Sequence, residues 1–179
     1  MGVQAWVSPQ RVTKVDGPTL ANNTAATSLL QAQDKIVVPG GALYVGFGLR
    51  VHILARVSTV VTTPGTLTLA LRYGASAIAT SQAFALTTTA QTNDTLIADV
   101  NLTCRAEGSS GNFMFDGQVS SNVFTNAFST VFFGPSTVPV VGGNADLSVN
   151  GFIDLVGTWS IANAANSITV HQFQVEFLG

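Results

Sequence analysis

Charge is scarce in this chain. Only 9% of its 179 residues are charged, against roughly 25% in an average globular protein. Seven basic residues stand against nine acidic ones, which gives a formal net charge of -2. Such a chain lacks the basic surface that attracts nucleic acid or an anionic membrane. We therefore expect neither a nucleic acid nor a membrane as a partner.

Cysteine and histidine are almost absent. Cys104 is the only cysteine, so no disulfide can form within the chain, and maturation in a reducing cytoplasm fits. His52 and His171 are the only histidines, and neither has a neighbour at the spacing of a metal site or a catalytic triad. We expect His52 at the surface and His171 beside a backbone irregularity. The sequence therefore predicts no metal, no cofactor and no small-molecule ligand.

Catalytic motifs are missing as well. The chain has no nucleophile elbow, no phosphate-binding loop and no zinc-protease motif, and its paired glycines Gly142-Gly143 are typical of a turn. Asp146 and Asp154 fall on one face of a single predicted strand, a spacing that would suit the carboxylate pair of a glycosidase. A solvated face explains the same spacing more simply. We expect that the protein is not an enzyme.

Long hydrophobic runs do not occur, although 46% of the residues are hydrophobic. The most apolar stretch, Ile36 to Val57, contains Pro39, several glycines and two arginines, which a membrane-spanning helix does not tolerate together. The apolar residues alternate with polar ones instead. Alternation with a period of two is typical of strands that bury one face.

The alternation predicts which residues of a strand point into the core and which point to solvent. In Leu49 to Val57 it points the arginines outward, and in Leu96 to Ala106 it places Cys104 in the core. Pro64-Gly65 is a turn signal, so the strands before and after it are predicted to form a hairpin or an adjacent pair. Near the end of the chain the alternation changes phase, which predicts a bulge at His171 and Gln172.

The pattern predicts an all-β protein: a jelly-roll-like antiparallel β-sandwich of about eight to ten strands with an extended N-terminal arm. We expect an arm over residues 1–23 and a single domain over residues 24–179. The predicted strands are Ala25 to Leu30, Lys35 to Val38, Gly46 to Val61, Gly65 to Tyr73, Ala77 to Leu86, Leu96 to Ala106, Phe113 to Val119, Val123 to Phe133, Ala145 to Trp159 and Ser167 to Phe177.

The N-terminal arm is the predicted contact element. An indole ring on an irregular terminus is costly to leave in water, so Trp6 is expected to dock either on its own domain or on a neighbour. We take Trp6, Val7, Arg11 and Val12 as candidate interaction residues. A surface built from Ser, Thr, Asn, Gln, Gly and Ala also associates readily, because little charge has to be desolvated. Self-assembly is the prediction, and an ordinary soluble β domain is the alternative.

Four strand-like segments of the chain resemble those of a known group of proteins. They are Asn166 to Phe177, Pro64 to Gly74, Leu102 to Gly108, and Asn22 to Leu30 followed by Ile36 to Pro39. The chain looks like the small virion proteins of tailed bacteriophages, the capsid decoration or cement proteins. This resemblance implies a jelly roll in homotrimers on the outside of an icosahedral head, where it clamps neighbouring subunits of the major capsid protein. It also implies a location at the capsid surface after synthesis in the host cytoplasm.

Two other classes share the predicted fold. One is a glycan- or receptor-binding module of a phage head or tail fibre, with Trp159, Phe152 or Tyr44 exposed in its loops. The other is a shell subunit of a small jelly-roll virus, which normally uses a basic arm to hold the genome. Arg11 and Lys14 are the only basic residues of the predicted arm.

Overall fold

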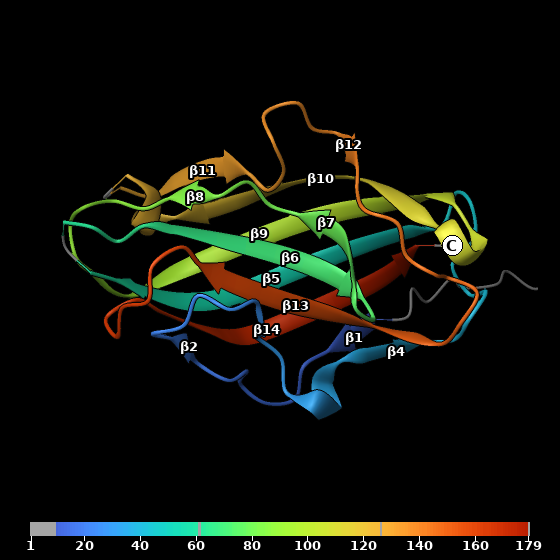
Figure 1. Ribbon diagram of the computed structural model, residues 1–179, viewed down its shortest axis with the longest axis horizontal. Helices are drawn as coiled ribbons and strands as arrows, with labels where there is room; N and C mark the ends of the chain where they lie inside the picture. The colour runs from blue at the N-terminus through green and yellow to red at the C-terminus, as the bar shows by residue number, and fades with distance from the viewer. Residues whose placement is uncertain (1–9, 61, 126, 179) are drawn as a thin grey trace, which may run out of the picture.

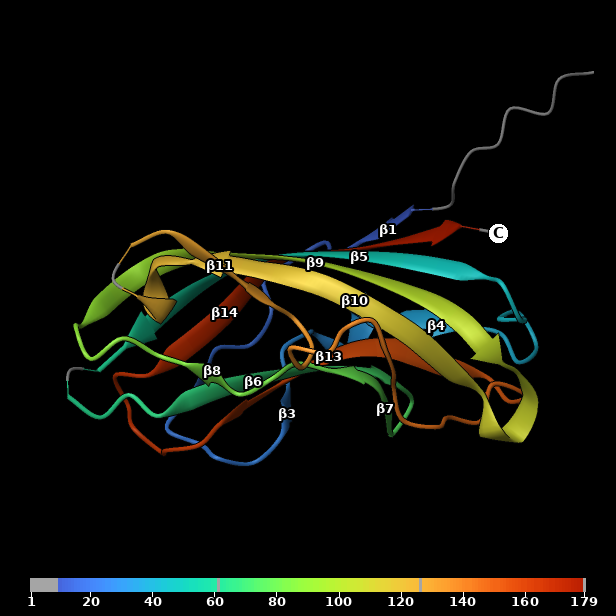
Figure 2. The same ribbon diagram turned by 90° about the horizontal axis from the view of Figure 1, so that it is seen from above.

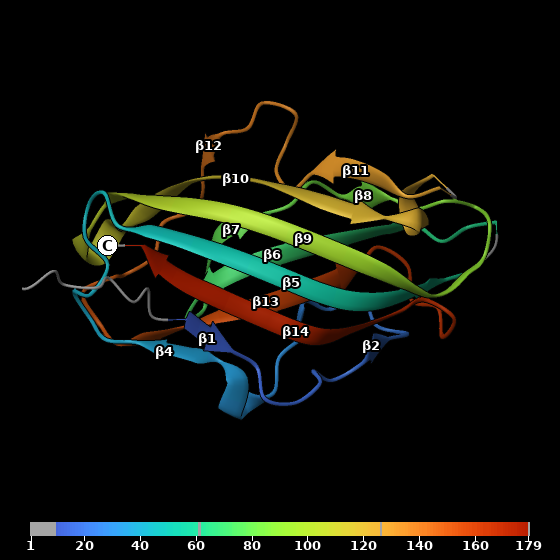
Figure 3. The same ribbon diagram turned by 180° about the vertical axis from the view of Figure 1, so that it is seen from behind.

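The chain forms two antiparallel sheets stacked as a sandwich. The computed structural model describes residues 10–60, 62–125 and 127–178. Seen from above in Figure 2, one layer contains β5, β9 and β10, and the other contains β6, β7 and β13. The eight-stranded sheet lies behind the six-stranded one in Figure 1 and in front of it in Figure 3.

The elements have the following bounds. In spatial order, the eight-stranded sheet contains β1 (Gln10–Val12), β14 (Ser167–Leu178), β5 (Gly48–Thr59), β9 (Gln91–Ala106), β10 (Asn112–Ser121) and β11 (Ser129–Phe132), with β2 (Leu20–Ala21) also on β14 and β12 (Val140–Val141) also on β10. The six-stranded sheet contains β3 (Thr27–Ser28), β13 (Gly151–Trp159), β6 (Thr66–Tyr73) and β7 (Ser76–Thr80), with β4 (Ile36–Val38) also on β13 and β8 (Phe84–Ala85) also on β6. Three short 3-10 helices are η1 (Ala32–Asp34), η2 (Gly108–Ser110) and η3 (Asn122–Phe124).

The strand order is that of a jelly roll. The chain crosses from the eight-stranded sheet to the six-stranded sheet between β5 and β6, and returns between β8 and β9. It crosses again to β13 and returns to β14. The pairings of β14 with β5 and of β13 with β6 therefore join the two ends of the fold across both sheets. This arrangement confirms the predicted all-β, jelly-roll-like sandwich.

The inward faces of both sheets supply the core. In β5, and in β9 from Leu96 to Cys104, every second side chain is buried, while Arg50 and Arg56 point outward as the alternation predicts. Each fully buried aliphatic or aromatic side chain stabilises the fold by about 1.5–3 kcal/mol through removal from water. The alternating apolar residues are therefore enough to hold the two layers together.

The predicted pairing around Pro64-Gly65 is wrong. β5 and β6 belong to different sheets, so this turn crosses the sandwich and does not close a hairpin. A buried side chain, Asn166, holds the crossing. Its Oδ1 accepts a hydrogen bond from the N–H of Val60 at 2.9 Å, and its Nδ2 donates to the carbonyl of Pro64 at 2.8 Å. The turn signal was correct, but the partner of each strand depends on contacts distant in the sequence.

Several predicted strands are shorter than expected: only β3 forms within Ala25 to Leu30, and Ala77 to Leu86 is divided between β7 and β8. The segment predicted as Val123 to Phe133 begins with η3, capped by Ser121, and becomes extended only at β11. In the segment predicted as Ala145 to Trp159, β13 forms from Gly151 to Trp159, and residues 145–150 form a loop before it, where hydrogen bonds to Asp146 and to neighbouring loops replace strand pairing. The bulge predicted at His171 and Gln172 is confirmed by a register shift in the pairing of β14 with β5.

The predicted arm contains two short strands. β1 and β2 both pair with β14, and Leu20 is buried against the core. Among the candidate interaction residues, the backbone of Arg11 lies opposite Val175, and the side chain of Val12 is exposed. Trp6 and Val7 lie outside the described residues.

Gly142 closes one side of the sandwich where the chain leaves β12 for β13. Its N–H donates to the carbonyl of Phe113 in β10 at 2.8 Å. Its Cα lies so close to β7 that an added Cβ would overlap the carbonyl oxygen of Ile78. Only glycine allows the chain to pass between the two sheets at this distance, which is the physical reason for the glycines at this turn.

We expect the substitution Asn166→Ala to lower the free energy of unfolding by about 2–4 kcal/mol, because it leaves the N–H of Val60 and the carbonyl of Pro64 without this partner. Urea unfolding monitored by tryptophan fluorescence measures the change. Asn144→Ala, at an exposed loop position, is the control and should change stability by less than about 0.5 kcal/mol. Equal effects of the two substitutions would contradict the clamping role of Asn166.

Candidate functional site

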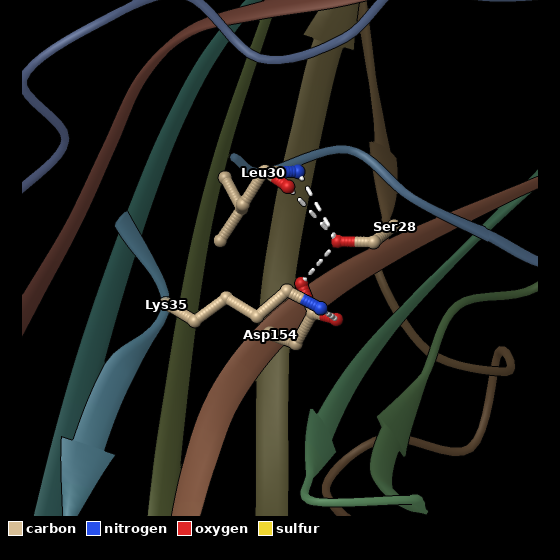
Figure 4. Close-up of polar contacts among 4 residues, drawn as sticks. All are labelled: Ser28, Leu30, Lys35 and Asp154. Atoms are coloured by element: carbon tan, nitrogen blue, oxygen red, sulfur yellow. Dashed lines mark hydrogen bonds and ion pairs between the residues drawn. The ribbon is translucent and has the colours of Figure 1, made fainter. Parts of the chain in front are cut away.

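A polar cluster on the six-stranded sheet contains Asp154, one of the two carboxylates weighed as a catalytic pair. Asp154 is buried on β13 and accepts hydrogen bonds from Ser28 Oγ and Lys35 Nζ, both at 2.7 Å (Figure 4). Ser28 also bonds the backbone of Leu30. The ammonium of Lys35 lies 5.0 Å from the centre of the Phe152 ring. One carboxylate oxygen thus binds the last residue of β3 and the other binds the residue before β4, so the cluster anchors both ends of the segment between these strands on β13.

Asp146 takes no part in this cluster. It lies in the loop before β13, where its carboxylate accepts hydrogen bonds from the N–H and hydroxyl of Ser148. The expectation that Asp146 and Asp154 share one strand face is therefore wrong, because the strand begins only at Gly151. The pair has no common site in which to act on a substrate.

Cys104 and Tyr73 are ionisable groups held in the core. Burial raises the pKa of the Cys104 thiol, and the nearby Glu107 carboxylate raises it further. The thiol donates a hydrogen bond to the carbonyl of Ala106 at 3.2 Å. Burial likewise raises the pKa of Tyr73, whose hydroxyl donates to the carbonyl of Val149 at 2.8 Å. Both groups stay protonated at neutral pH and serve as structural donors.

The eight-stranded sheet faces the viewer in Figure 3. Its outer face carries a network of polar side chains. On β5, His52 Nδ1 lies 2.7 Å from Asp99 Oδ1 of β9, which agrees with the predicted surface position of this histidine. At the next outward position of β9, the side-chain amide of Asn101 donates to Asp116 of β10 at 3.1 Å. The pairing of adjacent strands therefore brings an imidazole from β5 together with acids and an amide from β9 and β10.

A cleft of about 460 Å³ opens on this face. Its floor consists of residues of β9 and β10, most of them polar but including Ile97, and its wall includes the ring of Phe132 together with Val138 and Pro139. The wall is anchored by Phe133, which is buried in edge-on contact with Phe115 and whose N–H donates to the carbonyl of Gly117 at 2.9 Å. The cleft therefore has a fixed shape.

The second candidate surface is one end of the sandwich, formed by residues 39–47, 106–111 and 142–150, which we call the loop end. Backbone hydrogen bonds tie these loops together: Gly41 donates to Leu147, Leu147 to Gly108, and Gly46 to Cys104, all at 2.8–2.9 Å. The C-terminal end of β14 lies at the same end of the molecule (Figure 1). The loop end is thus a connected unit and not a set of independent loops.

Apolar side chains are exposed at the loop end. Tyr44 is 49% exposed, Val45 55% and Val149 53%. The loop end has two charged residues, Glu107 and Asp146. Glu107 accepts a hydrogen bond from the N–H of Val45, and Asp146 is bound to Ser148. Both carboxylates bind their own loops, so the surface offered to a partner combines exposed apolar side chains with two hydrogen-bonded carboxylates.

The aromatic residues predicted to carry a glycan-binding site are not gathered in loops. Trp159 lies in β13, buried, with its indole N–H donating to the carbonyl of Leu20 at 3.3 Å. Phe152 also lies in β13, beside Lys35, and only Tyr44 is an exposed loop residue. The prediction of loop positions for Trp159 and Phe152 is therefore wrong. Phe132, the exposed ring beside the cleft, was not among the residues that the sequence singled out.

Comparison of the chain with known protein-family models and with curated proteins finds no match. Within the described part of the chain, no helix has the length and apolar content needed to cross a membrane. Over the same residues, no three His, Cys, Asp or Glu side chains are grouped in a way that could hold a metal ion.

We expect the Cys104 thiol to resist modification in the folded protein, because it is buried and its raised pKa keeps it protonated. Mixing the protein with Ellman's reagent at pH 8 should give no rapid colour, whereas the same chain in concentrated urea should react fully within minutes. Complete reaction of the folded protein at the rate of the unfolded chain would show that the thiol is accessible.

Proposed function

We propose that this protein is a non-enzymatic structural protein of a virion. In this proposal it is a capsid decoration or cement protein that binds the outside of an icosahedral phage head as a homotrimer and stabilises contacts between major capsid subunits. The observation that carries the proposal is the loop end, where apolar side chains are exposed on loops that hydrogen bonds hold in place. Exposed apolar patches of this kind are typical of protein-binding surfaces.

The physical properties of the loop end suit a contact with a protein shell. Its two carboxylates already accept hydrogen bonds from its own loops, so part of their hydrogen bonding is kept when water leaves the surface. Hydrogen bonds already join its loops to one another, so little conformational entropy is lost when a partner binds. Apolar contacts are also weakly sensitive to salt. We therefore assign the shell contact to Tyr44, Val45 and Val149.

Self-association follows from the edges of the eight-stranded sheet and from its charge-poor surface. β1 and β11 are the outermost strands of this sheet, and unpaired strand edges favour pairing with other chains. A closed ring of copies covers such edges without forming open aggregates. In this proposal the N-terminal segment contributes to the contacts between copies or with the shell, through Trp6, Val7, Arg11 and Val12.

We expect light scattering coupled to size exclusion to give a mass of about 55 kDa, three times the chain mass of 18.5 kDa. The mass should stay constant over a dilution series from about 100 to 1 μM, because a closed interface of standard size dissociates only at lower concentration. A stable monomer across this range would contradict the homotrimer.

A double substitution of Tyr44→Ser and Val45→Ser tests the shell contact. We expect it to weaken binding to phage heads depleted of this protein by about tenfold or more, because it removes two exposed apolar anchors. Co-sedimentation with the heads measures the binding. The matched control is Ile161→Ser, which changes an exposed apolar residue in the loop that follows β13. Equal binding of the double variant and the control would contradict the assignment of the loop end.

A further inference from the structure

The cleft on the eight-stranded sheet carries a binding site that the proposed shell contact does not use. We propose that this cleft binds a neutral carbohydrate, through hydrogen bonds from its polar floor and stacking of a sugar ring on Phe132. The site is separate from the loop end and does not depend on the proposed function. Its residues come from three neighbouring strands, β9, β10 and β11, and from the loop that follows β11.

The floor presents four side chains in a fixed arrangement. Asp99 lies opposite Gln118, and Asn101 lies opposite Asp116, at successive outward positions of β9 and β10. Directly opposite side chains in such a sheet are about 4.5–5.5 Å apart. Acids and amides at this spacing can each contact a different hydroxyl group of one sugar ring. The sheet pairing therefore preorganises the polar contacts before a ligand arrives.

The hydrogen bonds within the floor leave donors and acceptors free to bind a ligand. Asn101 uses one amide N–H for Asp116 Oδ1, which leaves its second N–H and its carbonyl oxygen. Asp116 keeps its other oxygen as an acceptor, and Asp99 keeps Oδ2 because His52 is bound to Oδ1. Sugar hydroxyls both donate and accept hydrogen bonds, so this mixture of acceptors and amide donors matches a diol.

The wall provides an apolar surface. Phe132 is 51% exposed although it belongs to a strand, and its backbone carbonyl accepts a hydrogen bond from Gln82 Nε2 at 2.9 Å. The backbone of Phe132 is therefore held in place, and its ring remains open to solvent. The C–H face of a sugar packs on such a ring, and aromatic packing of this kind contributes about 0.5–1.5 kcal/mol beyond simple burial.

The charge of the cleft selects among carbohydrates. Two carboxylates, Asp99 and Asp116, line it, and none of the described residues that line it is basic. An anionic ligand such as a sialic acid, a uronic acid or a phosphate group would therefore be repelled. The cleft volume lies within the range of small-ligand sites, about 300–1,000 Å³. We infer a neutral mono- or disaccharide unit as the ligand.

The test is a titration of ¹⁵N-labelled protein with a panel of neutral sugars, followed by NMR. The panel contains the methyl glycosides of glucose, galactose, mannose and N-acetylglucosamine, together with maltose and lactose. We expect at least one sugar to shift the side-chain amide signals of Asn101 and Gln118, with a Kd in the millimolar range or tighter. Sialyllactose, the anionic member, should cause no shifts in these signals.

Two variants separate the site from nonspecific binding. Phe132→Ala should weaken the affinity by about tenfold, whereas Phe128→Ala, which removes another exposed ring of the same hairpin, should leave it unchanged. Asp116→Asn should also weaken binding while Asp146→Asn does not. Binding of the Phe132→Ala protein to phage heads should stay unchanged, because the ring lies outside the loop end, so the result is independent of the proposed shell contact.

The proposal is overturned if no sugar of the panel shifts the cleft signals at tens of millimolar concentration. It is also overturned if the Phe132→Ala and Phe128→Ala variants bind equally, or if sialyllactose binds as tightly as lactose. A response to calcium chloride that EDTA abolishes, with no response to any sugar, would assign the two carboxylates to a cation and would likewise reject the carbohydrate.

Discussion

The pairing of β14 with β5 is the contact on which the rest of the structure depends. It joins Ser167–Leu178 to Gly48–Thr59 along their whole length, so the last strand of the fold lies beside one of the first long strands. β14 also supplies the edge on which β1 and β2 pair. On the other side, β5 aligns β9, and β9 aligns β10. The registers of these pairs therefore set the positions of the polar side chains on the outer face and of the residues that line the cleft.

The alternation of residues predicted most of what lies within single strands. It correctly assigned the inward faces of β5 and β9, the burial of Cys104 and the bulge near His171, because each of these depends on the parity of a local pattern. It could not assign strand partners. The hairpin predicted at Pro64-Gly65 failed because Asn166, about 100 residues away, directs that turn across the sandwich.

The candidate sites were harder to predict, for a related reason. Asp99, Asn101 and Asp116 are ordinary outward residues in the sequence, and their grouping depends on the register of β9 with β10. Phe132 and Phe133 are neighbours in the sequence, yet one ring is exposed and the other is buried. Parity alone does not show which of the two faces the core, so the pattern could not single out Phe132. The loop end likewise depends on hydrogen bonds between loops that are remote in the chain.

The pairing of β1 with β14 has a consequence for engineering. Gln10 lies opposite Glu176, so the first and last described strands are adjacent in the same sheet. A short linker between these two points could join them, and new termini could then be opened in an exposed connection such as the turn between β6 and β7. A peptide fused to the chain near Gln10 or near Glu176 would leave the sandwich at the same edge of the sheet. This edge is therefore a suitable place to display added sequences.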